Sequence, residues 1–269
     1  MTEPDRSRSR RENRRFRRGT YILPACFTVA NLFCGFFSLV EVSRGRFDRA
    51  AVLIVAAAIL DGLDGRIARL TNTTSEFGLQ FDSMADIVSF GVAPAFLAHR
   101  WALLPLGRLG WLTAFLFVIC AATRLARFNI QQGSVDRRWF VGLPSPPAAV
   151  SVASVAFAFP EMLPERWLSA GFAILMAAVA LLMVSRVRYR SFKDLDLRNR
   201  RSYTVVLPIA AGLVAVMTHP KGALLVGSAT YLVSGLVSLA FSLAQRRGLR
   251  AAVRRADPRE VPEDGAERS

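Results

Sequence analysis

The chain has 269 residues, of which 52% are apolar, a formal net charge of +15 at pH 7 and a mean hydropathy of +0.32. These totals allow one large soluble domain or a polytopic membrane protein, so the distribution of apolar residues decides. Apolar runs of about 17–25 residues, long enough to cross a bilayer, follow one another, and no charged residue occurs from Tyr21 to Val40. This distribution indicates a membrane protein.

The expected fold class is all-α, a polytopic membrane bundle of about eight transmembrane helices, because lipid cannot hydrogen-bond an open sheet edge. The expected spans are roughly 21–43, 48–66, 77–98, 109–130, 146–162, 166–185, 203–218 and 222–244. They divide the chain into a basic amphipathic or disordered arm (1–20), a six-helix core (21–185), a basic loop (186–202), two additional helices (203–246) and a polar tail (247–269).

The positive charge is distributed unevenly between the loops. With the amino terminus in the cytoplasm, eight spans place both termini and most arginines on that side. Basic residues therefore indicate topology and attract anionic lipid headgroups. No nucleic-acid recognition motif accompanies them, so a nucleic-acid partner is not expected. The absence of targeting features favours an integral protein of a bacterial inner membrane.

Four aspartates lie between two apolar segments: Asp61, Asp64, Asp82 and Asp86. Each carboxylate at the bilayer centre costs roughly 2.5–3.5 kcal/mol or more, so the cluster needs a physical reason. The spacings i, i+3 and i, i+4 place each pair on one helix face. If the two helices pack together, the negative charges converge and a divalent cation relieves their repulsion. All-oxygen ligands favour Mg²⁺, Mn²⁺ or Ca²⁺ over zinc or copper.

Two other interpretations of the acids are open. The helices can be amphipathic with their acids facing water, or the acids can form the translocation site of an ion transporter. The second half of the chain has no matching acidic pair, which disfavours the transporter. The rise of a helix places Asp61 about 10 Å from the cytoplasmic boundary, so we expect a cavity open to the cytoplasm.

Other polar residues near the acids are candidate ligand contacts. Arg124 and Arg127 share a helix face beside Asn129, where the arginines can mark topology or bind a carboxylate or phosphate. Arg69 can bind a phosphate through two hydrogen bonds. Asn31 can reach a ligand or hydrogen-bond a neighbouring helix.

The central stretch reads D-x2-D-G-x2-A-R-x8-G-x3-D-x3-D, and it resembles the signature of the CDP-alcohol phosphatidyltransferase family. The residues at its defined positions are Asp61, Asp64, Gly65, Ala68, Arg69, Gly78, Asp82 and Asp86.

This resemblance implies transfer of a phosphatidyl group from a CDP-linked lipid to an alcohol, with release of CMP. It implies that the four aspartates bind two divalent ions, Mg²⁺ or Mn²⁺, and that Asp86 is also the catalytic general base. Gly65, Arg69 and Ser75 would contact the CDP moiety, although Ser75 also lies in a capping box that begins at Thr73. The family resemblance further implies a homodimer.

The segments 124–129 and 142–149 resemble the integral-membrane phosphatidylserine synthase branch of that family. This implies CDP-diacylglycerol and L-serine as substrates, with Arg124, Arg127 and Asn129 as candidates for binding the serine carboxylate. Glycerol 3-phosphate or an inositol compound is the alternative acceptor, since arginine binds phosphate equally well. The last two helices are expected to be scaffold.

Overall fold

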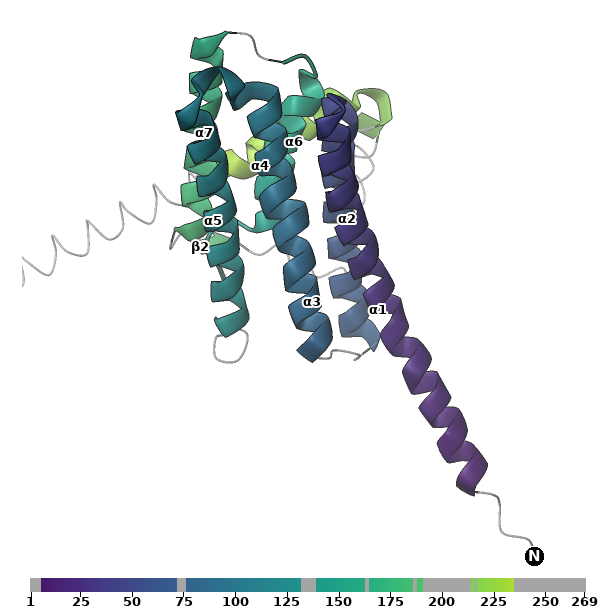
Figure 1. Ribbon diagram of the computed structural model, residues 1–269. Helices are drawn as coiled ribbons and strands as arrows, with labels where there is room; N and C mark the ends of the chain where they lie inside the picture. Colours follow the sequence, from purple (N-terminus) through teal and green to yellow (C-terminus); the bar gives the residue numbers. More distant parts are fainter. Residues whose placement is uncertain are drawn as a thin grey trace, which may run out of the picture.

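The computed structural model describes the backbone of residues 6–71, 76–131, 139–162, 165–185, 188–190, 214–215 and 217–234. Its helices stand side by side as a bundle (Figure 1). The α-helices are α1 (Arg6–Ser43), α2 (Phe47–Thr71), α3 (Glu76–Asp86), α4 (Ala93–Ala98), α5 (Arg108–Gln131), α6 (Ser145–Ala158) and α7 (Arg166–Val184). Residues 220–234 form a further helix.

One long helical stretch, from Glu76 to Leu106, contains α3 and α4. Two π-helical segments interrupt its α-helical geometry, η1 (Ile87–Val92) and η2 (His99–Leu103), and a 3₁₀ turn, η3 (Leu104–Leu106), ends it. Short π-helical segments are rare and often occur at functional sites. The first of them begins directly after Asp86.

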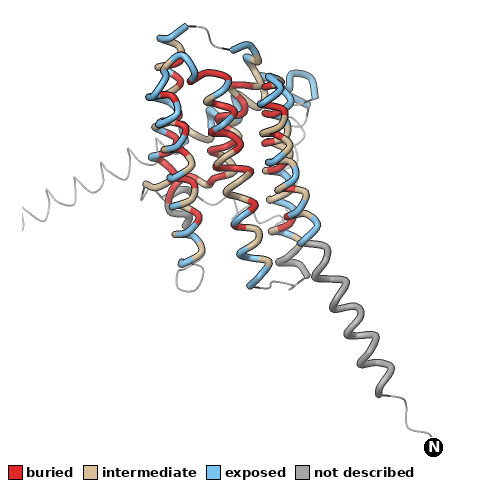
Figure 2. Tube along the Cα trace, in the orientation of Figure 1, coloured by how far each residue is buried: buried red, intermediate tan, exposed pale blue. Residues whose placement is uncertain are grey.

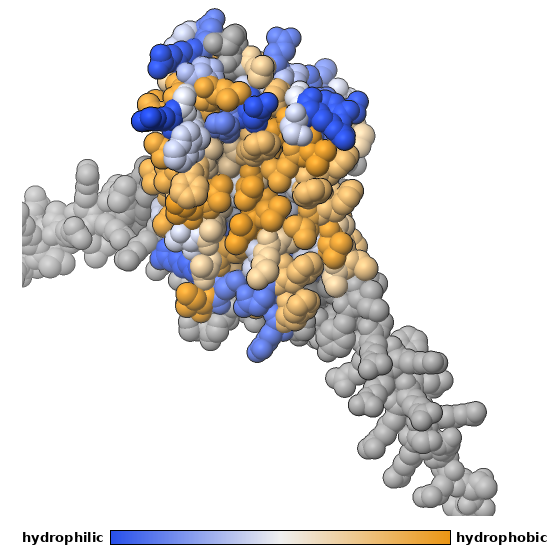
Figure 3. Space-filling model, viewed as in Figure 1, coloured by the Kyte–Doolittle hydropathy of each residue, from blue (hydrophilic) through white to orange (hydrophobic). Residues whose placement is uncertain are grey.

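Four helical stretches of the described chain are long and apolar enough to cross a membrane: Ala25–Ser43, Glu76–Leu106, Arg108–Ile130 and Arg166–Val184. Apolar side chains form a broad band across the visible face of the bundle, between two hydrophilic ends (Figure 3). The predicted all-α membrane bundle is confirmed, and the protein is integral to a membrane. The count of about eight spans stays a prediction. The expected spans 48–66 and 146–162 are helical but are not among these four stretches, and most of 203–218 and the end of 222–244 lie outside the described residues.

Small buried residues allow the helices to pack closely. α1 packs along α2, and α2 also packs against α6. Ala50, Ala57, Ala149 and Ala153 are fully buried there, and buried faces turn inward throughout the bundle (Figure 2). α6 has only 14 residues, so at the usual rise it is about 21 Å long. It is shorter than the four candidate spans, and its buried alanines make it an internal packing element of the bundle.

A short antiparallel strand pair accompanies the helices. β1 (Trp139–Val141) pairs with β2 (Arg188–Arg190), with Trp139 opposite Arg190. Gly142 follows with φ of 89°, and a side chain there would overlap the backbone carbonyl of Met183. This pairing places the segment before α6 and the segment after α7 on the same side of the bundle, as the predicted topology requires.

Candidate functional site

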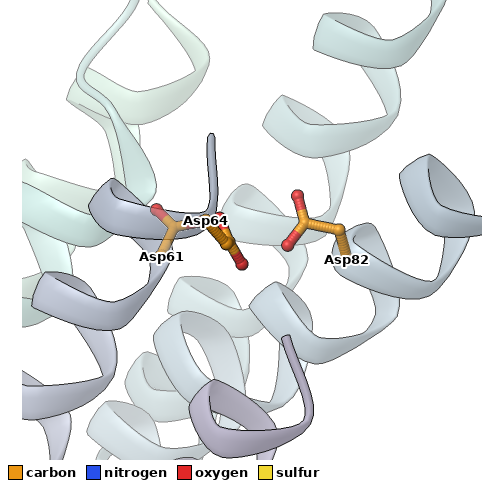
Figure 4. Close-up of side chains that lie close together, drawn as sticks. All are labelled: Asp61, Asp64 and Asp82. Atoms are coloured by element: carbon orange, nitrogen blue, oxygen red, sulfur yellow. The ribbon is translucent and has the colours of Figure 1, made fainter. Parts of the chain in front are cut away.

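Three carboxylates converge between α2 and α3. One oxygen each from Asp61, Asp64 and Asp82 lie within 4.8 Å of one another, and Figure 4 shows the side chains from the two helices turned toward each other. Asp64 is 5% exposed, and the other two are half-buried. The predicted convergence of the two acidic helices is therefore correct.

Asp86 lies beside this group as the last residue of α3. Its side chain contacts that of Asp61 and accepts a 3.3 Å hydrogen bond from Nδ2 of Asn31. It is not one of the three acids whose oxygens lie within the shared 4.8 Å. The four predicted ligands are thus adjacent, while the number of ions they hold stays a prediction.

The three-acid group suits a divalent cation. Oδ1 of Asp82 is buried and has no hydrogen-bond partner among the described residues. A buried, unpartnered carboxylate oxygen beside two more carboxylates is costly unless a cation compensates the negative charge. The ligands are all oxygens, the type that Mg²⁺ and Mn²⁺ prefer.

Two side chains of α1 donate hydrogen bonds to the acids, one to the α2 pair and one to the α3 pair. Thr28 donates a 3.3 Å hydrogen bond to Oδ2 of Asp64, and Asn31, one turn later, donates to Asp86. Of the two interpretations left open for Asn31, the structure shows the hydrogen bond to a neighbouring helix. The sequence interpretation missed Thr28, although its i, i+3 spacing from Asn31 in the uncharged stretch 21–40 is a usable signal.

Of the predicted acceptor-binding residues, Arg124 interacts electrostatically with two of the acids. Its guanidinium is within electrostatic range of Asp86 and Asp61, and its Nη1 donates a 2.6 Å hydrogen bond to Oγ of Ser145. Its Nε is buried and has no partner in the described part of the chain. A cation with an unused donor therefore lies within electrostatic range of Asp86, the predicted general base.

The other two predicted acceptor residues have different neighbours. Nδ2 of Asn129 donates a 2.8 Å hydrogen bond to Oγ of Ser83, the residue after Asp82. Nη1 of Arg127 lies 3.4 Å from the backbone carbonyl oxygen of Val184, at the end of α7. Asn129 is thus placed beside the acids, whereas Arg127 contacts the end of a neighbouring helix.

The predicted CDP-binding residues are only partly described. Gly65 is half-buried on α2, and the space that a side chain would occupy there is open. The side chain of Arg69 and all of Ser75 lie outside the described residues, as does the predicted cap at Thr73. Their contacts with a nucleotide stay predictions.

The helix formed by 220–234 also reaches the site. Ser228 shares a 2.8 Å hydrogen bond with Ser154 of α6, and Tyr231 packs partly buried against the core. The phenol of Tyr231 lies within electrostatic range of the Arg124 guanidinium. This helix was expected to be scaffold, and no motif in the sequence connects Tyr231 with a site 107 positions earlier.

Comparisons with known proteins identify similar chains. A family model described as CDP-alcohol phosphatidyltransferase matches residues 21–184. A CDP-diacylglycerol–serine O-phosphatidyltransferase of Helicobacter pylori is 41% identical over 230 residues, covering 84% of this chain and 94% of its own. Enzymes of the same name from Mycobacterium leprae and Bacillus subtilis are 34% and 33% identical, covering 78% and 67% of this chain and 72% and 96% of theirs.

Proposed function

Because this chain belongs to the CDP-alcohol phosphatidyltransferase family, we propose that it transfers a phosphatidyl group from CDP-diacylglycerol to the hydroxyl of L-serine. A bond forms between the serine oxygen and the phosphorus of the phosphatidyl group. The bond from that phosphorus to the CMP oxygen breaks, which gives phosphatidylserine and CMP. The observation that carries this proposal is the meeting of the α2 and α3 carboxylates in one centre, in a chain similar to enzymes of that name.

We propose that the four aspartates, Asp61, Asp64, Asp82 and Asp86, hold two divalent ions, Mg²⁺ or Mn²⁺. When bound, such ions supply charge neutralisation to the pyrophosphate and to the departing CMP. The close approach of three carboxylates and the unpartnered oxygen of Asp82 support this assignment.

Asp86 is the proposed general base. Its carboxylate accepts the proton of the serine hydroxyl as that oxygen attacks phosphorus, and a positioned base of this kind typically contributes 10²–10⁴-fold to the rate. Its place at the edge of the three-acid group supports this role, because a base must lie next to the activated phosphate and still reach the acceptor.

The remaining site residues bind the two substrates. The predicted acceptor residues Arg124, Arg127 and Asn129 bind the serine carboxylate, with Arg124 as the proposed main ligand. Gly65, Arg69 and Ser75 contact the CDP moiety. The position of Arg124 near Asp86 supports the first assignment, because the carboxylate and hydroxyl of serine are only a few bonds apart.

We further infer that the active site and both termini face the cytoplasm of a bacterial cell, with the chain in the inner membrane and assembled as a homodimer. The clustering of arginines on one side supports the orientation. A cytoplasmic site also has direct access to serine, which is charged and water-soluble. The orientation is tested by placing single cysteines in the loops and treating cells with a membrane-impermeant thiol reagent. Cysteines in cytoplasmic loops should react only after the cells are broken.

The function is tested with purified protein, CDP-diacylglycerol and Mg²⁺ or Mn²⁺. We expect CMP release only when an acceptor alcohol is present, with serine better than glycerol 3-phosphate or an inositol compound. The Asp86→Asn variant is the matched control, because it keeps the size of the side chain and removes the base. Fastest turnover with an acceptor other than serine would refute the assignment of serine.

A further inference from the structure

Asn31 lies against the proposed base from a helix that contributes no acid to the site. Its side chain is fully buried in the middle of the first span. An ionised carboxylate only accepts hydrogen bonds, so the Asn31 atom facing Asp86 must be the donor Nδ2. The 3.3 Å bond from Nδ2 to Oδ1 of Asp86 joins residues 55 positions apart.

The backbone of Asn31 is held by a second contact with the same region. Oγ of Ser89 donates a 3.0 Å hydrogen bond to the carbonyl oxygen of Asn31, and Ser89 is fully buried. Ser89 belongs to the π-helical segment η1, which begins directly after Asp86. The side chain and the backbone of Asn31 are therefore tied to two points on either side of the junction between α3 and η1.

Gly35, one turn after Asn31, permits this contact. A Cβ at Gly35 would lie 2.8 Å from Cα of Ser89, which is too close for two carbon atoms. The absence of a side chain therefore allows α1 to approach η1 closely enough for the two hydrogen bonds.

The amide oxygen of Asn31, Oδ1, does not compete with Nδ2 in orienting the side chain. Oδ1 is buried and has no hydrogen-bond partner among the described residues. The Asp86 bond is thus the polar contact that the structure shows for this side chain. Asn31 is therefore a buried amide that contacts one carboxylate, and its helix is held against the segment next to that carboxylate. Such an amide can fix the orientation of the Asp86 side chain.

We infer that Asn31 is a positioning residue for Asp86. By donating to Oδ1 it holds the Asp86 carboxylate in one rotamer between turnovers, so that the base keeps its orientation toward the acceptor hydroxyl. Asn31 touches neither substrate in this role. The inference rests on the proposed function, because it assigns a task to Asp86 in that reaction.

The test compares Asn31→Leu with wild type in the CMP-release assay. Leucine has a similar size and stays buried, but it cannot donate a hydrogen bond. We expect kcat to fall about 10- to 100-fold, the range caused by a misplaced catalytic group. The KM values for serine and CDP-diacylglycerol and the Mg²⁺ concentration for half-activation should stay within about twofold.

Ser38→Ala is the matched control on the same helix. Ser38 is fully buried and donates a 3.0 Å hydrogen bond to the backbone carbonyl of Ala50. The Ser38→Ala variant thus loses a helix-to-helix hydrogen bond comparable to that of Asn31, but one that does not involve the acids. We expect its kcat to stay within about twofold of wild type after correction for folded protein.

Several outcomes would overturn the inference while the proposed function stands. One is an unchanged kcat in Asn31→Leu, another is a raised serine KM with normal kcat, and a third is an equal loss in Ser38→Ala. If Asn31→Leu does not fold, Asn31→Ser is judged by the same separation of kcat from KM. A wild-type protein that releases no CMP with any acceptor would instead reject the proposed function itself.

Discussion

Nη1 of Arg124 donates a 2.6 Å hydrogen bond to Oγ of Ser145, joining α5 to the first residue of α6. The bond fixes one end of the guanidinium, whose charge interacts with Asp86 and Asp61. We expect Arg124→Gln to raise the serine KM at least tenfold, the effect of losing a charged hydrogen bond of roughly 1.5–3 kcal/mol. The KM for CDP-diacylglycerol should change less than about twofold, as measured by varying each substrate in turn.

Arg127 provides the comparison for Arg124, because both are arginines on the same helix. Its guanidinium contacts the backbone carbonyl of Val184 at the end of α7. We expect Arg127→Gln to raise the serine KM less than Arg124→Gln does. A larger effect at Arg127 would contradict the assignment of Arg124 as the main ligand of the serine carboxylate.

Divalent ions should stabilise the folded protein through the acidic centre. A ligand that binds only the folded state raises the unfolding temperature, by an amount that grows with the ratio of its concentration to its Kd. We expect Mg²⁺ or Mn²⁺ to raise the Tm of wild-type protein in detergent and EDTA to reverse the rise. Asp82→Asn, which changes the acid with the unpartnered oxygen, should lose most of this shift. An equal shift in this variant would place the ions elsewhere.

The acidic centre could be predicted from sequence because helical geometry alone places Asp61 beside Asp64 and Asp82 beside Asp86. The meeting of the two pairs followed from the electrostatic argument that isolated carboxylates do not persist in lipid. The contact between Asn31 and Asp86 could not be predicted, because it depends on which faces of α1 and α3 meet. The same is true of Ser145 as the partner of Arg124.

Close packing of α1 against η1 predicts a sharp difference between two glycines. Gly35→Ala places a methyl group against the backbone of Ser89, so we expect a loss of about 1–3 kcal/mol in unfolding free energy from overpacking. Gly171→Ala, on α7, is the control, because the space for a side chain there is open. We expect it to be neutral or slightly stabilising, since alanine favours a helix. Thermal unfolding in detergent compares the two, and equal losses would contradict the packing.

The backbone also limits what a sequence pattern can predict. The third span was expected to end near residue 98, but its helical stretch continues to Leu106 through two π-helical segments. These segments depend on tertiary packing and leave no periodic signature in the hydrophobic pattern. The pairing of β1 with β2 is likewise made by main-chain groups, and segments of three residues each are too short for a sequence pattern to predict it.

Tyr231 tests whether the helix beyond the family-matched region takes part in acceptor binding. The family match ends at residue 184, and Tyr231 lies on the helix that a 2.8 Å hydrogen bond from Ser228 joins to α6. Its phenol lies within electrostatic range of Arg124. We expect Tyr231→Phe, which removes only the hydroxyl, to raise the serine KM about two- to tenfold, the effect of roughly 0.5–1.5 kcal/mol.

Thr230→Val is the control for Tyr231→Phe. It also removes one hydroxyl from the same helix, but Thr230 is exposed and its Oγ1 donates to the backbone carbonyl of Val226 at 2.7 Å. Its serine KM should match that of wild type. In a double-mutant cycle, Tyr231→Phe should have little further effect once Arg124 is glutamine, because the phenol acts through the guanidinium. Additive effects would mean that Tyr231 influences the acceptor independently of Arg124.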